Sequence, residues 1–359
     1  MSTVKIAKER LDSIIKKARV DFYKPIQIAE VLRYLRLIGD IDITNINTYQ
    51  NPSIHWRNTV TKRLLGKIST SSARYQHDVW NLSAMYPELL SILDNENKRT
   101  NGCVERYIYL KFNERQETVG SIISFIENVS PQDFKLSVLL DKFIKDIQVR
   151  RSIDKTYEII TYSLFETIVV ALGATIKVSI PSSSKELLAE FSDLVCVLLG
   201  LEIGKESWEF PAHIYRVGVT NAADRGLDMW TNFGPAIQVK HMTLNKNLAE
   251  KIVDQVESDN IVIVCCDADA EVIEVITKQI SWGQRVRGIV RESELINWYE
   301  RCLRGKFSSQ TAQPLMNRLV NSFKAEFPQA SAMIDFLEEH EYLSMSVDKV
   351  WVTDIDINF

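Results

Sequence analysis

A carboxylate, an amide and an ammonium lie close together in one short stretch of the sequence. Asp228 precedes Gln238 and Lys240, and Val239 lies between the latter two. Side chains alternate along a β-strand, so Gln238 and Lys240 share one face while Val239 points to the other. If Asp228 lies on the neighbouring strand of a hairpin, about 4.8 Å away, the three polar side chains can converge on one point.

These three side chains are the parts that hydrolysis of a phosphodiester requires, and we predict Asp228, Gln238 and Lys240 as catalytic residues. The Asp228 carboxylate would hold a hard divalent cation, Mg²⁺, which polarises the phosphoryl group and lowers the pKa of water. Lys240 would orient or deprotonate the attacking water and offset charge on the phosphate. The Val239 carbonyl and the Gln238 amide oxygen would complete the metal shell.

The same residues also fit a sheet face that is simply solvated, and the order of the surrounding elements favours a site instead. Apolar periodicity predicts a helix, three strands, a second helix and a further strand, at 185–200, 212–220, 227–230, 236–242, 245–259 and 260–266. This order predicts an α/β core in which a three-strand meander is followed by a helical crossover.

An aspartate followed by Gln-x-Lys across a hairpin, within this order of elements, resembles the PD-(D/E)xK nucleases. The chain has Leu227 where that family often has proline, and Gln238 where glutamate is commoner. The glutamine variant resembles the methyl-directed Mrr-type nucleases, whose glycine just before the aspartate matches Gly226. The missing glutamate leaves a second metal position open, and Asp224, Glu190 and Glu166 are the candidates to fill it.

A longer resemblance extends over two segments of the chain. "YRVGVTNAADRGLDMWTNFGPAIQVKHMTL" (215–244) and "SIHWRNTVTKRLLGKISTSSARYQHDVW" (53–80) are similar to the HaeII-type restriction endonucleases. The resemblance implies a type II site-specific deoxyribonuclease that uses Mg²⁺ to cut double-stranded DNA at a short palindromic site. It also implies a cognate DNA methyltransferase that acts on the same site.

The single Asp…Gln-x-Lys set predicts a homodimer. One such site cuts one strand, so cutting both strands of a twofold-symmetric sequence needs two copies whose axis coincides with that of the DNA. Apolar helices among the first 150 or the last 60 residues could form the interface. Two alternatives remain open from the sequence: a repair nuclease that selects DNA structure or modification, and a catalytically dead DNA-binding protein.

The segment 43–77 is the best candidate for DNA binding. It contains no acidic residue in a chain whose formal net charge is −4. Lys and Arg contact phosphates, with Ser, Thr and Asn assisting. The segment predicts two short helices, the second capped by Ser71 or Ser72, in a helix-turn-helix-like arrangement. The alternative is a solvated basic face without a ligand. The basic residues are Arg57, Lys62, Arg63, Lys67 and Arg74.

The first 150 residues are predicted to be mostly helical. Helices are expected at 26–39, with a stop at Gly39, and at 130–151, with Ser130 as the N-cap. A helix that ends at Gly173 and a strand at 174–180 follow. We therefore expect a helical region at 1–150 for DNA recognition or dimerisation, and an α/β nuclease domain with C-terminal helices at 151–359.

Composition excludes several protein classes. The pI near 5.9 gives no global basic excess, and the five cysteines match no zinc-binding spacing. The N-terminus lacks the apolar region of a signal peptide, and no apolar run reaches the roughly 18 residues that a membrane helix needs. The sequence predicts a cytoplasmic protein in a reducing compartment, with no membrane partner.

Overall fold

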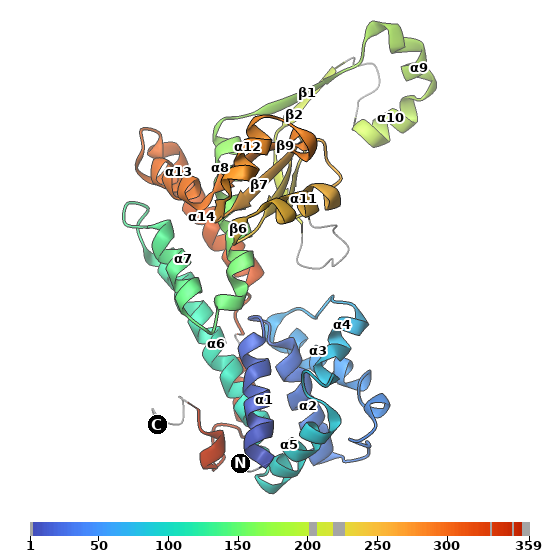
Figure 1. Cartoon of the computed structure of the whole chain (residues 1–359), viewed down its shortest axis with the longest axis vertical. Helices are drawn as coiled ribbons and strands as arrows, with labels where there is room; N and C mark the ends of the chain where they lie inside the picture. The colour runs from blue at the N-terminus through green and yellow to red at the C-terminus, as the bar shows by residue number, and fades with distance from the viewer. Residues whose placement is uncertain (1–2, 201–206, 218–226, 331, 347, 354–359) are drawn as a thin grey trace. The chain divides into compact units, whose positions relative to one another are not determined.

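The computed structural model describes residues 3–200, 207–217, 227–330, 332–346 and 348–353. It is a mixed α/β structure, mostly helical, with one mixed five-stranded sheet (Figure 1). The described chain forms two compact units: one contains 3–159 and 319–353, the other 160–217 and 227–318. The sequence assigned 319–359 to the α/β domain, whereas the contacts group the described part of that segment with the N-terminal residues.

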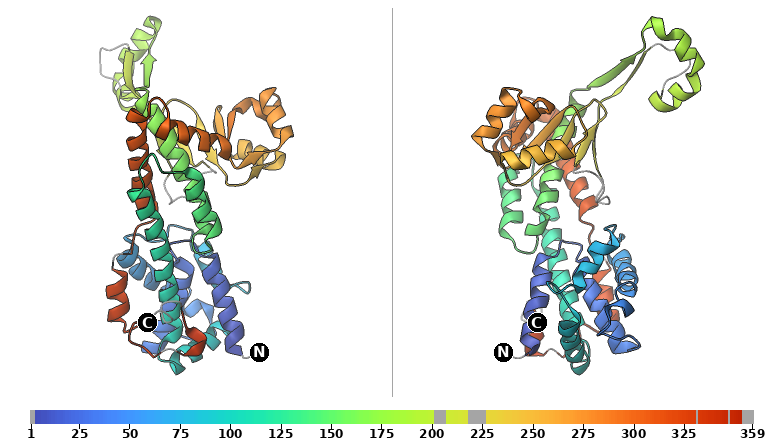
Figure 2. Two further views of the ribbon diagram at one scale, coloured as in Figure 1. Left: turned by 90° about the vertical axis from the view of Figure 1, so that its left-hand side faces the viewer. Right: turned by 45° about the vertical axis from the view of Figure 1, so that its right-hand side comes forward.

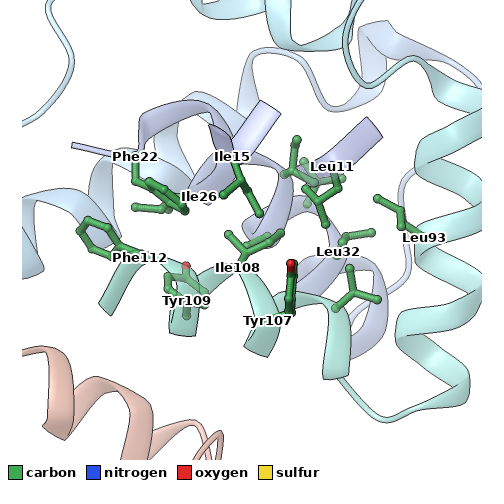
Figure 3. Close-up of a cluster of buried hydrophobic side chains, with 14 of the residues drawn as sticks. Leu11, Ile15, Phe22, Ile26, Leu32, Leu93, Tyr107, Ile108, Tyr109 and Phe112 are labelled. Atoms are coloured by element: carbon green, nitrogen blue, oxygen red, sulfur yellow. The ribbon is translucent and has the colours of Figure 1, made fainter. Parts of the chain in front are cut away.

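The first unit is helical, as the sequence predicted for residues 1–150. A shared core joins most of its helices, and Leu11, Ile15, Ile26, Ile108 and Phe112 are among the buried side chains (Figure 3). Its helices are α1 (Thr3–Lys17), α2 (Tyr23–Leu37), α3 (Pro52–Leu65), α4 (Ala73–His77), α5 (Pro87–Arg99), α6 (Cys103–Asn128), α7 (Leu136–Lys145) and α15 (Met333–Glu339). Helices α8 (Ile153–Ala171) and α14 (Ser308–Glu326) begin in one unit and end in the other.

The helix boundaries correct one prediction in this unit. The helix expected from Ser130 begins at Leu136 instead. The Ser130 hydroxyl and the Asp133 side chain bond each other, and the Asp133 N–H donates to the hydroxyl at 3.2 Å. Ser130 therefore caps a turn that precedes the helix, a role that serine fills as readily as a helix cap. Gly39 and Gly173 both have positive φ just after a helix, as their helix-stop positions predicted.

The second unit is built on a five-stranded sheet of order β3-β4-β5-β7-β9. The first three strands form the predicted antiparallel meander, and β7 and β9 add in parallel through the crossover helices α11 (Lys246–Gln255) and α12 (Ala270–Thr277). The strands are β3 (Ile214–Arg216), β4 (Met229–Thr231), β5 (Ala236–Val239), β7 (Ile261–Cys265) and β9 (Val286–Arg291). The short strands β6 (Thr243–Leu244) and β8 (Asp267–Ala268) pair in parallel beside it.

Helix α11 packs on one part of one sheet face. Its buried residues Ala249, Ile252 and Val253 share an apolar cluster with Ala236 of β5 and with residues of β7. The edge strand β3 and its neighbour β4 contribute no buried residue to this cluster. Helix α8 is tied to α13 (Glu292–Arg304) by the Tyr299 hydroxyl, which donates to the Ile160 carbonyl at 2.9 Å.

The helix expected at 185–200 has a different structure. It is broken at Phe191 into α9 (Lys185–Glu190) and α10 (Ser192–Leu199), and neither short helix buries a residue. Both lie at the end of an antiparallel ribbon formed by β1 (Thr175–Ser179) and β2 (Ser207–Pro211), away from the five-stranded sheet (Figures 1 and 2). The meander is contacted at its first strand by α8 instead, because Glu166 accepts the Ile214 N–H of β3.

Two predictions about the chain's class can be compared with the structure. No disulfide joins the five cysteines. Within the described ranges, no helix combines the length and the apolarity that crossing a bilayer requires.

Candidate active site

Strand register places Asp228 opposite Gln238. Met229 pairs with Ile237 across the β4–β5 hairpin, so the preceding residue of β4 faces the residue that follows Ile237. Asp228 is also anchored to β3, because its carbonyl accepts the Val217 N–H at 2.9 Å. The aspartate therefore lies at the point where the meander's first two strands part.

The Asp228 carboxylate binds β5 directly. Its Oδ2 accepts a hydrogen bond from Gln238 Nε2 at 2.5 Å and another from the Val239 N–H at 2.7 Å. The side chains of Asp228 and Gln238 thus meet on one face of the sheet, as the alternation of β5 requires.

Gln238 is not on a solvated face. Its exposed fraction is 2%, and all four residues of β5 are buried. Its Oε1 is buried and has no hydrogen-bond partner among the described residues. A buried acceptor without a partner costs about 1–3 kcal/mol, so an unpartnered amide oxygen beside a carboxylate marks a position where a ligand would be favourable.

Lys240 follows β5 by one residue and keeps the strand's alternation. Its N–H donates to the Val264 carbonyl of β7 at 2.8 Å, so the backbone is still held in the sheet there. The side chain is half-buried, and within the described chain its ammonium has neither a hydrogen bond nor an ion pair. The Lys240 ammonium is therefore held on the face of Gln238, and no carboxylate among the described residues neutralises its charge.

The oxygen donors near Asp228 suit a hard cation. The N–H and C=O of one strand residue point to the same edge, so the Val239 carbonyl lies on the side where its N–H meets Asp228. Together with the Gln238 Oε1, this gives three kinds of oxygen ligand, which are those that Mg²⁺ accepts. The described residues contain no cluster of three or more His, Cys, Asp or Glu side chains that could hold a metal.

The candidate upstream acids have different positions. Asp224 and Gly226 lie outside the described residues. Glu190 is exposed on α9 at the end of the ribbon, and no described contact joins it to Asp228.

Glu166 is buried on α8 and bonds the start of β3. Its carboxylate lies 2.9 Å from His213 Nδ1 and accepts the Ile214 N–H at 2.7 Å. Asp228 bonds Val217, three residues further along β3, which is about 10 Å away at the rise of a strand. Glu166 therefore positions β3 against α8 and lies at the other end of the strand from Asp228.

An aromatic pair beside the site was missed by the sequence reasoning. The rings of Tyr215 and Trp230 stack with centroids 4.4 Å apart and planes at 20°. Trp230 is two residues beyond Asp228 on the same strand, so it shares its face, and Tyr215 is its partner on β3. Their exposed fractions are 40% and 45%. The alternation that joined Gln238 to Lys240 would have found Trp230 had it been applied to β4.

Arg57 is the basic residue of segment 43–77 whose place differs most from the prediction. It is 1% exposed, and its guanidinium donates to Gln27 at 3.1 Å and to Gln76 and Asn58, both at 2.6 Å. Burial lowers its pKa to about 10. A guanidinium held this way ties α3 to α2 and α4 and cannot reach DNA in this structure, so charge type alone was misleading here.

The other four basic residues of the segment divide into two pairs. Arg63 forms a two-pronged ion pair with Glu339, at 2.7 and 2.6 Å, and Lys67 pairs with Asp21 at 2.8 Å. Lys62 and Arg74 are exposed, and neither has an ion-pair partner among the described residues. Helix α4 has five residues and is capped by Ser72, whose hydroxyl accepts the Tyr75 N–H.

Comparisons with known proteins match the chain to restriction endonucleases. A family model described as HaeII restriction endonuclease matches residues 7–342. The chain is 45% identical over 345 residues to the type II restriction enzyme HaeII of Haemophilus aegyptius, which covers 95% of this chain and 98% of the relative. It is 43% identical over 339 residues to the type II restriction enzyme NgoBI of Neisseria gonorrhoeae, covering 94% and 96%. No solved structure matches the chain.

Proposed function

The chain belongs to the HaeII restriction endonuclease family, and on that premise we propose that Asp228, Gln238 and Lys240 form the active site of a sequence-specific endonuclease that hydrolyses double-stranded DNA. The observation that carries this site is the meeting of Asp228 with a buried Gln238 whose Oε1 lacks a partner among the described residues. The order α8, β3-β4-β5, α11, β7, with β1, α9, α10 and β2 inserted between α8 and β3, supports the PD-(D/E)xK core as the scaffold.

We propose Mg²⁺ as the cofactor, held by the Asp228 carboxylate, the Val239 carbonyl and the Gln238 amide oxygen. When bound, the cation supplies Lewis-acid polarisation of the phosphoryl group and makes a neighbouring water easier to deprotonate. In the observed orientation, Gln238 turns its Nε2 toward Asp228. Rotation of the amide by about 180° exchanges N for O, two atoms of nearly the same size, and brings the oxygen to the carboxylate's side.

Lys240 acts on water and on the phosphate. Its ammonium lies on the face of Gln238 and has no anionic partner among the described residues, so its charge is available to the scissile phosphate. A lysine in this position orients the attacking water and stabilises the charge that grows on the phosphoryl oxygens.

The Tyr215–Trp230 pair provides a surface for the strand being cut. It lies on the face of Asp228, one same-face position along the strands, and α11 leaves this edge of the sheet uncovered. The exposed rings offer apolar area against which deoxyribose can pack, and sugar contacts fix the position of a strand without reading its sequence.

Lys62 and Arg74 are the proposed phosphate contacts of the helical unit. Both are exposed, whereas Arg63 and Lys67 are already paired with carboxylates and Arg57 is buried. We also propose that the enzyme is a homodimer that cuts a short palindromic site. A cognate methyltransferase is the further partner, since a host must protect the sequence that the enzyme cuts. We propose the cytoplasm, where the DNA lies, as the location of the protein.

Digestion of a sequenced plasmid tests the proposal. The wild type in Mg²⁺ should give discrete fragments with uniform ends. Lys240→Ala should reduce the rate by at least about a hundredfold, the usual contribution of a positioned proton-transfer group, while it still shifts cognate DNA in Ca²⁺. Lys251→Ala, at an exposed lysine of α11, is the matched control and should cut normally.

Three results would contradict the proposal. Full turnover by Lys240→Ala would remove the lysine from the mechanism. Cleavage confined to branched or modified DNA would identify a repair nuclease. DNA that is bound but never cut in Mg²⁺ would identify a DNA-binding protein.

A further inference from the structure

The β1–β2 ribbon and the two helices that it carries form an arm, defined here as the described residues of 175–211. Five residue pairs join the two strands, from Thr175–Pro211 to Ser179–Ser207. The helices α9 and α10 lie at its end, away from the sheet, in both views of Figure 2. Neither helix buries a residue, so packing against the described chain does not stabilise them as it does α11.

Large apolar side chains are concentrated on the end of the arm and are open to solvent. Val197 is 82% exposed and Leu198 is 70% exposed, on a helix whose sequence is SDLVCVLL. A helix that is apolar nearly all round is normally buried. The other exposed apolar residues of the arm are Leu187 (62%), Phe191 (46%), Leu194 (49%) and Leu199 (49%).

The charge of the arm disfavours DNA as the occupant. Its described residues include two lysines, Lys177 and Lys185, against four carboxylates. The carboxylates are Glu186, Glu190, Asp193 and Glu209. Phosphate repels such a surface, and an anionic membrane does so too, because interfacial helices carry Lys and Arg on their polar face. The occupant is therefore another protein surface.

We propose that the occupant is a second copy of this chain, so that the arms join two subunits. This rests in part on the proposed function: each chain has one Asp228–Gln238–Lys240 set, and cutting both strands needs two. Six apolar side chains exposed to this degree leave on the order of several hundred Å² open, comparable with the ~800 Å² that each partner buries in a standard interface. In a twofold contact the same patch serves both subunits, so one apolar surface suffices.

The arm explains why the sequence could not locate this interface. A run such as "LVCVLLGL" indicates burial, and within one chain burial means the core. An apolar run can be buried in the core of its own chain or against a partner. The structure favours a partner, because the described residues of this run are exposed at the end of a two-stranded ribbon.

Light scattering on the full-length chain tests the inference. The wild type should have the mass of a dimer, and the double variant Val197→Asp, Leu198→Asp should have that of a monomer at the same concentration. Leu82→Asp is the matched control, since Leu82 is 81% exposed outside the arm, and it should remain dimeric. Far-UV circular dichroism should be close to wild type in both variants, because the mutated side chains are exposed in the single subunit.

A second variant, Leu187→Asp on α9, should weaken the dimer in the same direction. A wild type that is monomeric both free and on cognate DNA overturns the inference, and so does a double variant that stays dimeric. Either outcome leaves the active-site proposal intact, because that is tested by Lys240→Ala, which should lose cleavage but remain a dimer. A monomeric arm variant that still nicks DNA would support both.

Discussion

At the scale of single residues, the site depends on what Gln238 does with its two amide atoms. Nε2 is used by Asp228, and Oε1 is buried without a partner among the described residues. A glutamate at this position would repel Asp228 until a cation arrived, whereas glutamine bonds it in the absence of one. In the proposed site the amide would therefore stabilise the metal-free state and bind the cation more weakly than a glutamate would, because a neutral oxygen binds a cation less tightly than a carboxylate.

Gln238→Glu tests this trade. Two carboxylates in a nearly buried site should lower Tm without metal, by roughly 2–4 °C for each kcal/mol of destabilisation. Mg²⁺ should raise Tm more in the variant than in the wild type, because binding to the folded state stabilises it. Calorimetry with and without Mg²⁺ measures both shifts.

Asp228→Asn is the matched control for that experiment. It removes the anionic ligand while keeping the shape of the side chain, so Mg²⁺ should leave its Tm unchanged. If Gln238→Glu shows no larger response to Mg²⁺ than Asp228→Asn does, Gln238 does not face the metal.

The aromatic pair gives a second test at this scale. Trp230→Leu keeps an apolar side chain but removes the exposed ring that stacks on Tyr215. Cognate DNA binding should weaken about fivefold, corresponding to roughly 1 kcal/mol of lost ring contact, with a larger effect on KM than on kcat. Phe233→Leu is the control, because Phe233 in the β4–β5 turn is exposed to a similar degree, 40% against 45% for Trp230. Equal effects of the two substitutions would argue against a specific surface at Trp230.

At the scale of elements, periodicity predicted the segments that are regular and half-buried. The meander, α11 and β7 all appeared from apolar spacing, and the register that joins Asp228 to Gln238 followed from strand alternation. Three features of the structure differ from the predictions. Ser130 prefers a turn to a cap, the apolar helix at 185–200 is exposed on an arm, and Arg57 is buried. The exposure of the helix at 185–200 and the burial of Arg57 depend on which distant residues are nearby, and a window of sequence does not contain that information. Ser130 bonds Asp133 three residues away, and the local signals for a turn and for a helix cap are the same there.

The α3–α4 segment makes a quantitative prediction at this scale. Replacing Lys62 and Arg74 together by alanine should reduce the slope of log K against log salt by about 2, close to one unit for each lost phosphate contact. Arg63→Ala should change the slope less, because Glu339 already neutralises that guanidinium. Binding measured at several salt concentrations decides the point. An unchanged slope in the double variant would mean that this face does not meet the phosphates.

At the scale of the whole molecule, the described residues of one chain contain one proposed site, so cutting both strands of a duplex would require an assembly of two chains. The described residues contain a single Asp228–Gln238–Lys240 arrangement, and the arm is the surface through which we join two such chains. In the proposed arrangement each subunit would cut one strand. The two active sites would react independently of each other, but a single binding event would bring both to the DNA. Removing one lysine from a dimer should then disable one strand only.

Mixed dimers test this directly. Wild-type and Lys240→Ala chains carrying different affinity tags can be co-expressed, and the heterodimer isolated through both tags. On supercoiled plasmid with one site, the heterodimer should produce nicked circles that persist, whereas the wild-type homodimer should produce linear DNA in one binding event. The nicking rate should be about half the wild-type rate of first-strand cleavage, since one of two equivalent sites remains. If the heterodimer linearises plasmid as fast as the wild type in a single encounter, one site cuts both strands, and the symmetric assembly is wrong.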